Sequence, residues 1–163
     1  MRPRFFLLIA LMAFPVVLAG CASSGNTGAR QSQVRANLGT AARSTLVNET
    51  VQILTSRYGY NMLRTVMDTE DMRFETDWKQ ESALADEKDQ GYTHARTKIT
   101  VTARPRNRST SGSQNLAVNF VAETQVLPFG NEVWISIEPT DERKDALRQI
   151  STYLRRTYQT AMR

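Results

Sequence analysis

Three segments of the chain, residues 72–79, 92–103 and 116–124, alternate between apolar and polar side chains with a period of two. This alternation is typical of strands that bury one face and leave the other in solvent. Residues 61–67 and 133–137 match the same pattern less regularly. Because turn and polar segments separate these runs, the sequence predicts an antiparallel sheet of about four strands.

A helix is predicted before the first of these strands. Val47, Val51, Leu54 and Tyr58 recur at helical spacing and form one apolar stripe, and Gly59 follows them. Glycine is the residue that most readily takes the left-handed conformation that ends many helices. The pattern therefore predicts a helix over residues 45–58.

A second helix is predicted after the last strand. Thr140 is a suitable N-cap, and the acids at 141 and 142 favour the positive end of a helix dipole. The apolar stripe of this helix comprises Leu147, Ile150, Leu154 and Tyr158. We assign its polar face to Arg143, Lys144, Arg148, Arg155 and Arg156.

The order helix, strands, helix predicts the fold class. A half-buried antiparallel sheet needs a cover, and two amphipathic helices can supply it from one side. We expect one α+β globular domain over residues 45–163, a two-layer sandwich with the N-terminal and the C-terminal helix on the same face of the sheet.

The first residues of the chain have the layout of a secretory signal peptide. Arg2 and Arg4 precede the uncharged run from Phe5 to Leu18, and the small residues Ala19 and Gly20 end it. A basic start, an apolar centre and a small-residue cleavage region are the three parts of such a signal. Residues 1–20 are therefore expected to be removed.

The sequence Leu18-Ala19-Gly20-Cys21 resembles the lipobox of bacterial lipoproteins. The resemblance implies a diacylglyceryl group on the Cys21 thiol, cleavage before this cysteine, and acylation (palmitate) of its new amino group. Several acyl chains hold a protein stably on a membrane, whereas a single chain binds only reversibly. Residues 21–44 are polar and are expected to form a lipidated flexible linker. Ala22, in place of aspartate, suggests an outer-membrane lipoprotein facing the periplasm.

Two alternatives to this interpretation stay open at the N-terminus. The uncharged stretch Phe5–Ala22 approaches the roughly 17–25 residues that span a bilayer, so an uncleaved anchor helix is one of them. Pro15 and the pair Ala19-Gly20 count against that helix. A cleaved signal without lipid is the other alternative.

Composition and motifs argue against several function classes. Without Arg2 and Arg4 the chain has 19 basic and 16 acidic residues, and the basic ones are scattered, so we predict no nucleic-acid partner. His94 is the only histidine and no nucleophile motif accompanies it, so we predict that the protein is not an enzyme. The acids at 68–71 and 86–89 lack calcium-loop spacing and are expected to be solvated turn residues. No metal site and no cofactor is predicted.

Two further groups of residues are candidates for contacts. Arg104, Arg106 and Arg108 alternate in a polar connection between strands and could bind phosphates or an acidic partner. A solubilising loop that discourages strand pairing is the commoner role of such a segment. Trp78 and Trp134 could anchor an interface, although their patterned strands favour core packing. For Trp134, which opposes Val133 and Ile135, partial exposure stays open as an alternative.

The order of elements, the Gly59-Tyr60 pair after the first helix and the Thr76-Asp77-Trp78 strand end resemble small periplasmic lipoprotein domains of the helix-grip type. Accessory lipoproteins of outer-membrane assembly contain such domains. The resemblance implies a membrane-anchored, non-enzymatic interaction or assembly factor with an envelope protein partner. A lipid- or glycan-binding lipoprotein, with a ligand between helices and sheet, is the alternative function.

Overall fold

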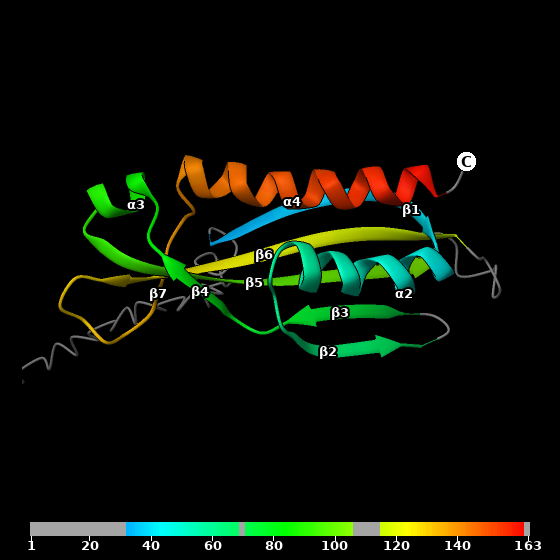
Figure 1. Cartoon of the computed structure of the whole chain (residues 1–163), viewed down its shortest axis with the longest axis horizontal. Helices are drawn as coiled ribbons and strands as arrows, with labels where there is room; N and C mark the ends of the chain where they lie inside the picture. The colour runs from blue at the N-terminus through cyan, green and yellow to red at the C-terminus, as the bar shows by residue number, and fades with distance from the viewer. Residues whose placement is uncertain (1–31, 69–70, 106–114, 162–163) are drawn as a thin grey trace, which may run out of the picture.

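The computed structural model describes residues 32–68, 71–105 and 115–161. Figure 1 shows a long twisted sheet with helices α2 and α4 packed side by side on one of its faces. The α+β class is confirmed, and the sheet is larger than the predicted four strands. All of its strand pairs are antiparallel.

The sheet has seven strands: β1 (Gln33–Ala42), β2 (Met62–Met67), β3 (Met72–Thr76), β4 (Lys79–Ser82), β5 (Tyr92–Pro105), β6 (Asn115–Pro128) and β7 (Ile135–Ser136). Five of them follow the order β1-β6-β5-β3-β2, while β4 pairs with β5 and β7 pairs with β6. The long strands β5 and β6 therefore form the centre of the sheet. Each of β1, β3, β4 and β7 pairs with one of them, and β2 is attached through β3.

The helices are α2 (Arg43–Gln52), which continues into the wider π-helical turn η1 (Ile53–Arg57), the short α3 (Ala85–Asp89), and α4 (Asp141–Thr160). Thr140 caps α4, because its side-chain oxygen accepts a hydrogen bond from the Arg143 backbone N–H. Gly59 has a φ of +68° where η1 ends. Both helix predictions and both of their terminal signals are confirmed.

The core lies between the helices and one face of the sheet. Alternate residues of β5 and β6 are buried there, among them Ile99, Val101, Val118 and Phe120, each 0% exposed. The helices contribute the following buried side chains: Leu46, Ile53, Leu54, Leu147, Ile150, Leu154 and Tyr158. A hydrogen bond of 2.8 Å between the hydroxyls of Thr50 and Tyr158 joins α2 to α4 inside this layer.

The flexible linker predicted over residues 21–44 is wrong in its last part, because residues 33–42 form β1 along the edge of β6. Apart from Val34 and Leu38 its side chains are small or polar, and the register shifts between Asn37 and Gly39. Such a bulge interrupts the period-two pattern on which strand prediction depends. Only the pairing with β6 and the burial of Leu38 and Ala41 reveal the strand.

Three smaller predictions also need correction. The polar segment between the predicted strands 72–79 and 92–103 is not only a connection, because it contains most of β4 and the whole of α3. The last strand shrinks from 133–137 to Ile135–Ser136. Trp78 lies beyond the end of β3 rather than inside a strand.

The conformation of Gly59 leads to the first prediction. Gly59→Ala should lower the free energy of unfolding by about 1–2 kcal/mol, since a side chain disfavours the left-handed region by that amount. A Cβ at this position would meet Lys79 Cε at 3.8 Å, an ordinary contact, so strain in φ is the main cost. Urea unfolding measures the change. Gly59→Asn should lose less, because asparagine tolerates this conformation better; equal losses would contradict the explanation.

Candidate interaction surface on the open face of the sheet

We call the side of the sheet that faces away from α2 and α4 the open face. Alternate residues of β5 and β6 lie on it and are half-buried, among them Arg96, Lys98, Val121 and Gln125. No helix in the described part of the chain covers this side (Figure 1).

Trp78 reaches the open face because one extra residue separates β3 from β4. Glu75 pairs with Thr100 and Lys79 pairs with Thr97, so four steps along one strand match three along β5. A one-residue slip sends the following side chains to the opposite face. Lys79 therefore turns toward the helices, and Trp78 lies beside Arg96 rather than in the core.

Arg96 lies between two indole rings. Its guanidinium carbon is 4.7 Å from the ring centroid of Trp78 and 4.6 Å from that of Trp134. Lys98 Nζ is 5.4 Å from the Trp78 centroid. Neither tryptophan belongs to the hydrophobic core cluster, so core packing is wrong for Trp78, whereas Trp134 has the partial exposure that its sequence position left open. We call Trp78, Arg96, Lys98, Gln125 and Trp134 the Trp–Arg cluster.

Gln125 fixes the orientation of Arg96. Arg96 Nε and Nη2 both donate to Gln125 Oε1, at 2.8 and 2.5 Å. Gln125 Nε2 in turn donates to Ser136 Oγ at 3.3 Å, which holds the amide oxygen toward the arginine. Burial lowers the pKa of Arg96 below its ordinary value. The guanidinium is thus partly desolvated and held by neutral groups.

The neighbouring cation of the cluster is paired differently. Lys98 Nζ lies 3.5 Å from Glu75 Oε1 and 3.6 Å from Glu123 Oε2. In the ranges that the structure describes, no carboxylate is bonded to Arg96. The half-buried charge of Arg96 therefore lacks the compensation that Lys98 receives.

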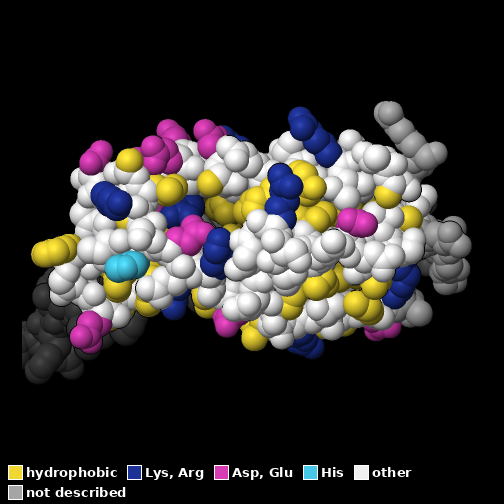
Figure 2. Space-filling model, in the orientation of Figure 1, with side chains coloured by type: hydrophobic (Ala, Val, Ile, Leu, Met, Phe, Trp, Pro, Cys, Tyr) yellow, Lys and Arg dark blue, Asp and Glu magenta, His cyan; other side chains and the backbone are white. Residues whose placement is uncertain are grey.

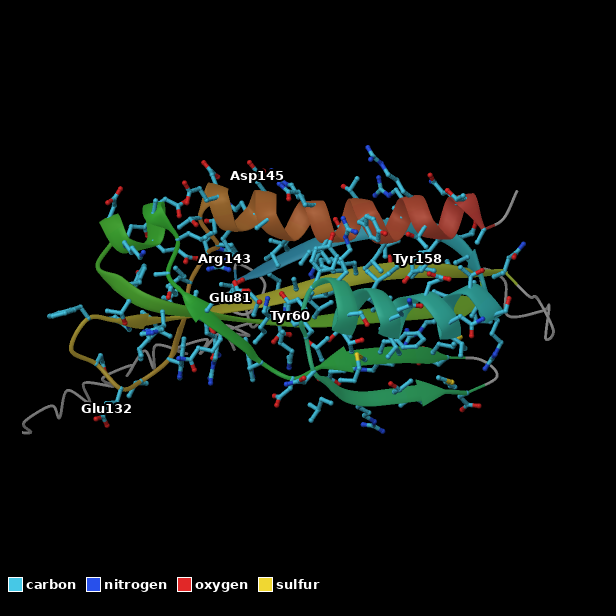
Figure 3. The ribbon with its side chains drawn as sticks, in the orientation of Figure 1. Tyr60, Glu81, Glu132, Arg143, Asp145 and Tyr158 are labelled. Carbon is cyan, nitrogen blue, oxygen red and sulfur yellow. The ribbon has the colours of Figure 1, made fainter. Side chains whose placement is uncertain are left out.

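A second group of charges lies on the helix side of the sheet, and we call Lys79, Glu81, Glu87 and Arg143 the charge network. Arg143 Nε and Nη2 donate to the two carboxylate oxygens of Glu87, at 2.9 and 2.8 Å. Arg143 Nη1 donates to Glu81 at 3.0 Å, and Lys79 Nζ lies 2.6 Å from the other oxygen of Glu81. Figure 3 shows Glu81 and Arg143 directed at one another from β4 and α4.

The centre of the charge network, Arg143 with Glu87, is buried, which the sequence analysis did not predict. Arg143 is only 3% exposed and Glu87 is 0% exposed, so neither the polar-face assignment of Arg143 nor the solvated-turn prediction for Glu87 holds. Burial alone would raise the pKa of Glu81, but Lys79 and Arg143 outweigh it and hold that pKa below its ordinary value. Because these bonds join β4 and α3 to the first turn of α4, the network fastens this end of the domain. Figure 2 shows acidic and basic side chains gathered there.

The residues predicted as sites are mostly outside the described part of the chain. Leu18, Ala19, Gly20 and Cys21 lie there, as do Arg106 and Arg108. Arg104 is exposed at the end of β5, and its Nη2 donates to Asp71 Oδ2 at 3.0 Å. The structure therefore places one of the three loop arginines, and that one already has an acidic partner.

The remaining candidates for chemistry are dispersed. His94 is half-buried on β5, where its Nδ1 lies 3.2 Å from Thr93 Oγ1. The residues that the structure describes contain no group of three or more His, Cys, Asp and Glu side chains placed to hold a metal. A surface hollow of about 490 Å³ lies at the first turn of α2, lined by Ala42, Arg43, Ser44, Val47 and Asn48. None of the described helices is both long enough and apolar enough to cross a bilayer.

The fold and the surface define an α+β domain with the half-exposed Trp–Arg cluster on the open face of its sheet. Comparison with known proteins adds no family: no family model matches the chain, and no curated protein matches it either.

Proposed function

We propose that the protein is a membrane-anchored envelope lipoprotein that acts as a non-enzymatic interaction or assembly factor, with the open face as its docking surface. The observation that carries this proposal is the arginine held between two half-exposed tryptophans. Tryptophan and arginine are the residues most enriched among those that dominate binding energy at protein interfaces. The lipid on Cys21 and the outer-membrane location are parts of the same proposal, based on the lipobox.

The ligand-binding alternative is less well supported. A lipid or glycan between helices and sheet needs space there, whereas the described core is a continuous cluster of buried side chains from both layers. The surface hollow at α2 is formed by residues of one turn and lies at the start of the helix. The open face therefore remains the better candidate for recognition.

Anchoring is tested by the Cys21→Ala variant of the full chain in bacterial cells. We expect it to lose incorporation of labelled palmitate and to retain residues 1–20, because the thiol is the acceptor of the lipid that precedes cleavage. Metabolic labelling and intact-mass measurement give both results. Arg43→Ala is the control variant, and it should be lipidated and cleaved like the wild type. A wild-type protein with a free Cys21 thiol would refute the anchor.

Docking is tested by photo-crosslinking from single positions. A photoreactive residue at Gln80, which is exposed and pairs with Arg96 across β4 and β5, should crosslink a defined envelope protein. The control is Asp145, whose side chain is 68% exposed on α4 and points away from the sheet in Figure 3. The crosslink from position 80 should weaken at least several-fold with Arg96→Gln. Equal products from both positions would contradict docking on the open face.

A further inference from the structure

The guanidinium of Arg96 has unused hydrogen-bonding capacity. Arginine carries five N–H donors in a planar fork, and the contacts to Gln125 use Nε and Nη2. The edge formed by Nη1 and Nη2 stays available for a second acceptor. A carboxylate can bind this edge with two parallel hydrogen bonds.

The arrangement is also pre-organised for such an acceptor. The two indole rings restrict the side chain from both sides, and Gln125 restricts its rotation. Fixing a flexible arginine before binding reduces the entropy that the complex would otherwise lose. The same surroundings remove water from the cation without supplying a negative charge, and an uncompensated desolvated charge is typical of functional sites.

Two other buried or half-buried cations of the described chain are paired with carboxylates, unlike Arg96. Arg143 is bonded to Glu87 and Glu81, and Lys98 lies near Glu75 and Glu123. Within the described ranges, Arg96 receives only an amide oxygen and two aromatic faces. The fold thus neutralises these cations with carboxylates but leaves Arg96 without one.

The rings of the cluster indicate what else the ligand carries. Trp78 and Trp134 flank Arg96 and are half-exposed. Indole rings offer a large apolar contact surface and are enriched among the residues that dominate binding at protein interfaces, so they favour a partner with apolar side chains next to its acid. Acidic residues flanked by apolar residues meet both requirements.

We infer that the Trp–Arg cluster binds a carboxylate of a partner peptide in which aspartate or glutamate stands next to large apolar residues. The carboxylate accepts from Nη1 and Nη2 of Arg96, the cation of the cluster that has no carboxylate partner among the described residues. This inference rests on the proposed docking function and names the chemistry of its partner.

The cluster provides its own reporter, because Trp78 and Trp134 are the only two tryptophans of the chain. The probe is a five-residue peptide of alternating leucine and glutamate with blocked ends, titrated into the full-length protein in mild detergent. We expect a saturable change in tryptophan emission. The same peptide with glutamine in place of glutamate should bind roughly 10- to 100-fold more weakly, as expected when a charged hydrogen-bond partner is lost.

The matched variants are Arg96→Gln and Arg35→Gln. Arg35 is an exposed arginine of β1 on the same sheet face, and its side chain bonds to Gln33, so both variants remove one positive charge. Only Arg96→Gln should weaken glutamate-peptide binding roughly 10- to 100-fold. Arg96→Lys should also weaken it, since lysine keeps the charge but not the planar fork.

Three outcomes would overturn the inference: equal binding of the two peptides, equal effects of the two variants, or competition by inorganic phosphate or glucuronate at the same concentration as the peptide. The last would assign the cluster to phosphates or acidic glycans. Palmitate labelling of Cys21 and crosslinking from position 80 are measured separately, so they show whether the docking proposal fails together with this inference or survives it.

Discussion

Arg143→Ala is expected to destabilise the domain by about 3–5 kcal/mol, because it leaves the fully buried Glu87 carboxylate without its cation. Glu87 Oε2 also accepts the Leu84 backbone N–H, so the start of α3 loses its support at the same time. Small domains have a total stability of about 5–15 kcal/mol. Urea unfolding should therefore show a midpoint well below that of the wild type.

Arg148→Ala is the matched control, since it removes an arginine of the same helix that is 65% exposed and paired with Asp145. An exposed pair of this kind contributes at most about 1 kcal/mol. The double variant Arg143→Met with Glu87→Leu should recover most of the lost stability, because neither buried charge then remains. Similar losses for Arg143→Ala and Arg148→Ala would show that the charge network does not fasten the domain.

The sequence carried a signal for Arg143 that the assignment to the polar face overlooked. Positions 143, 147, 150, 154 and 158 follow one helical stripe, so an arginine at the first of them faces the same layer as the leucines. Hydrophobicity alone places such a residue in solvent. The carboxylates that make its burial tolerable come from β4 and α3, about 60 residues away in sequence, and only the fold brings them to α4.

On the open face, the strand alternation was predictable from the sequence, but the irregular segments beside the strand were not. The alternation in β5 correctly placed Arg96 and Lys98 on the polar side of the strand. The extra residue between β3 and β4, however, is visible only in the pairing with β5, so the period-two pattern put Trp78 on the wrong face. Trp134 approaches Arg96 from a segment that is mostly not strand. The parts of the fold with regular periods were predictable, whereas the site depends on irregularities between them.

The two faces of the sheet differ in how their cations are paired. On the helix side, Arg143 is bonded to Glu87 and Glu81 beside the apolar core. On the open face, Arg96 is held in place but keeps hydrogen-bonding capacity for another molecule. Rigid support beneath a surface residue lowers the cost of binding through it. The strength of the scaffold and the recognition proposed for the cluster are therefore connected through β4 and β5.

Alkaline pH is expected to destabilise the domain through two buried tyrosines. Burial raises the pKa of Tyr60 and of Tyr158 to about 12, despite their hydrogen bonds to Thr97 and Thr50. In the unfolded chain both ionise near pH 10, so their contribution is complete below that pH and is lost as pH rises toward 12. A shift of two units corresponds to about 2–3 kcal/mol for each residue.

Urea unfolding between pH 9 and pH 12 tests this loss. Tyr60→Phe and Tyr158→Phe should each be less stable than the wild type at pH 8, because a threonine hydroxyl loses its partner, yet each should lose stability less steeply above pH 10. Tyr92→Phe, which alters a half-exposed ring on β5, is the control and should keep the wild-type slope. A wild-type slope in all three variants would mean that other groups cause the alkaline transition. If only the two buried positions alter it, the hydroxyls of Tyr60 and Tyr158, which join the η1–β2 connection to β5 and α4 to α2, stabilise the core only while they stay protonated.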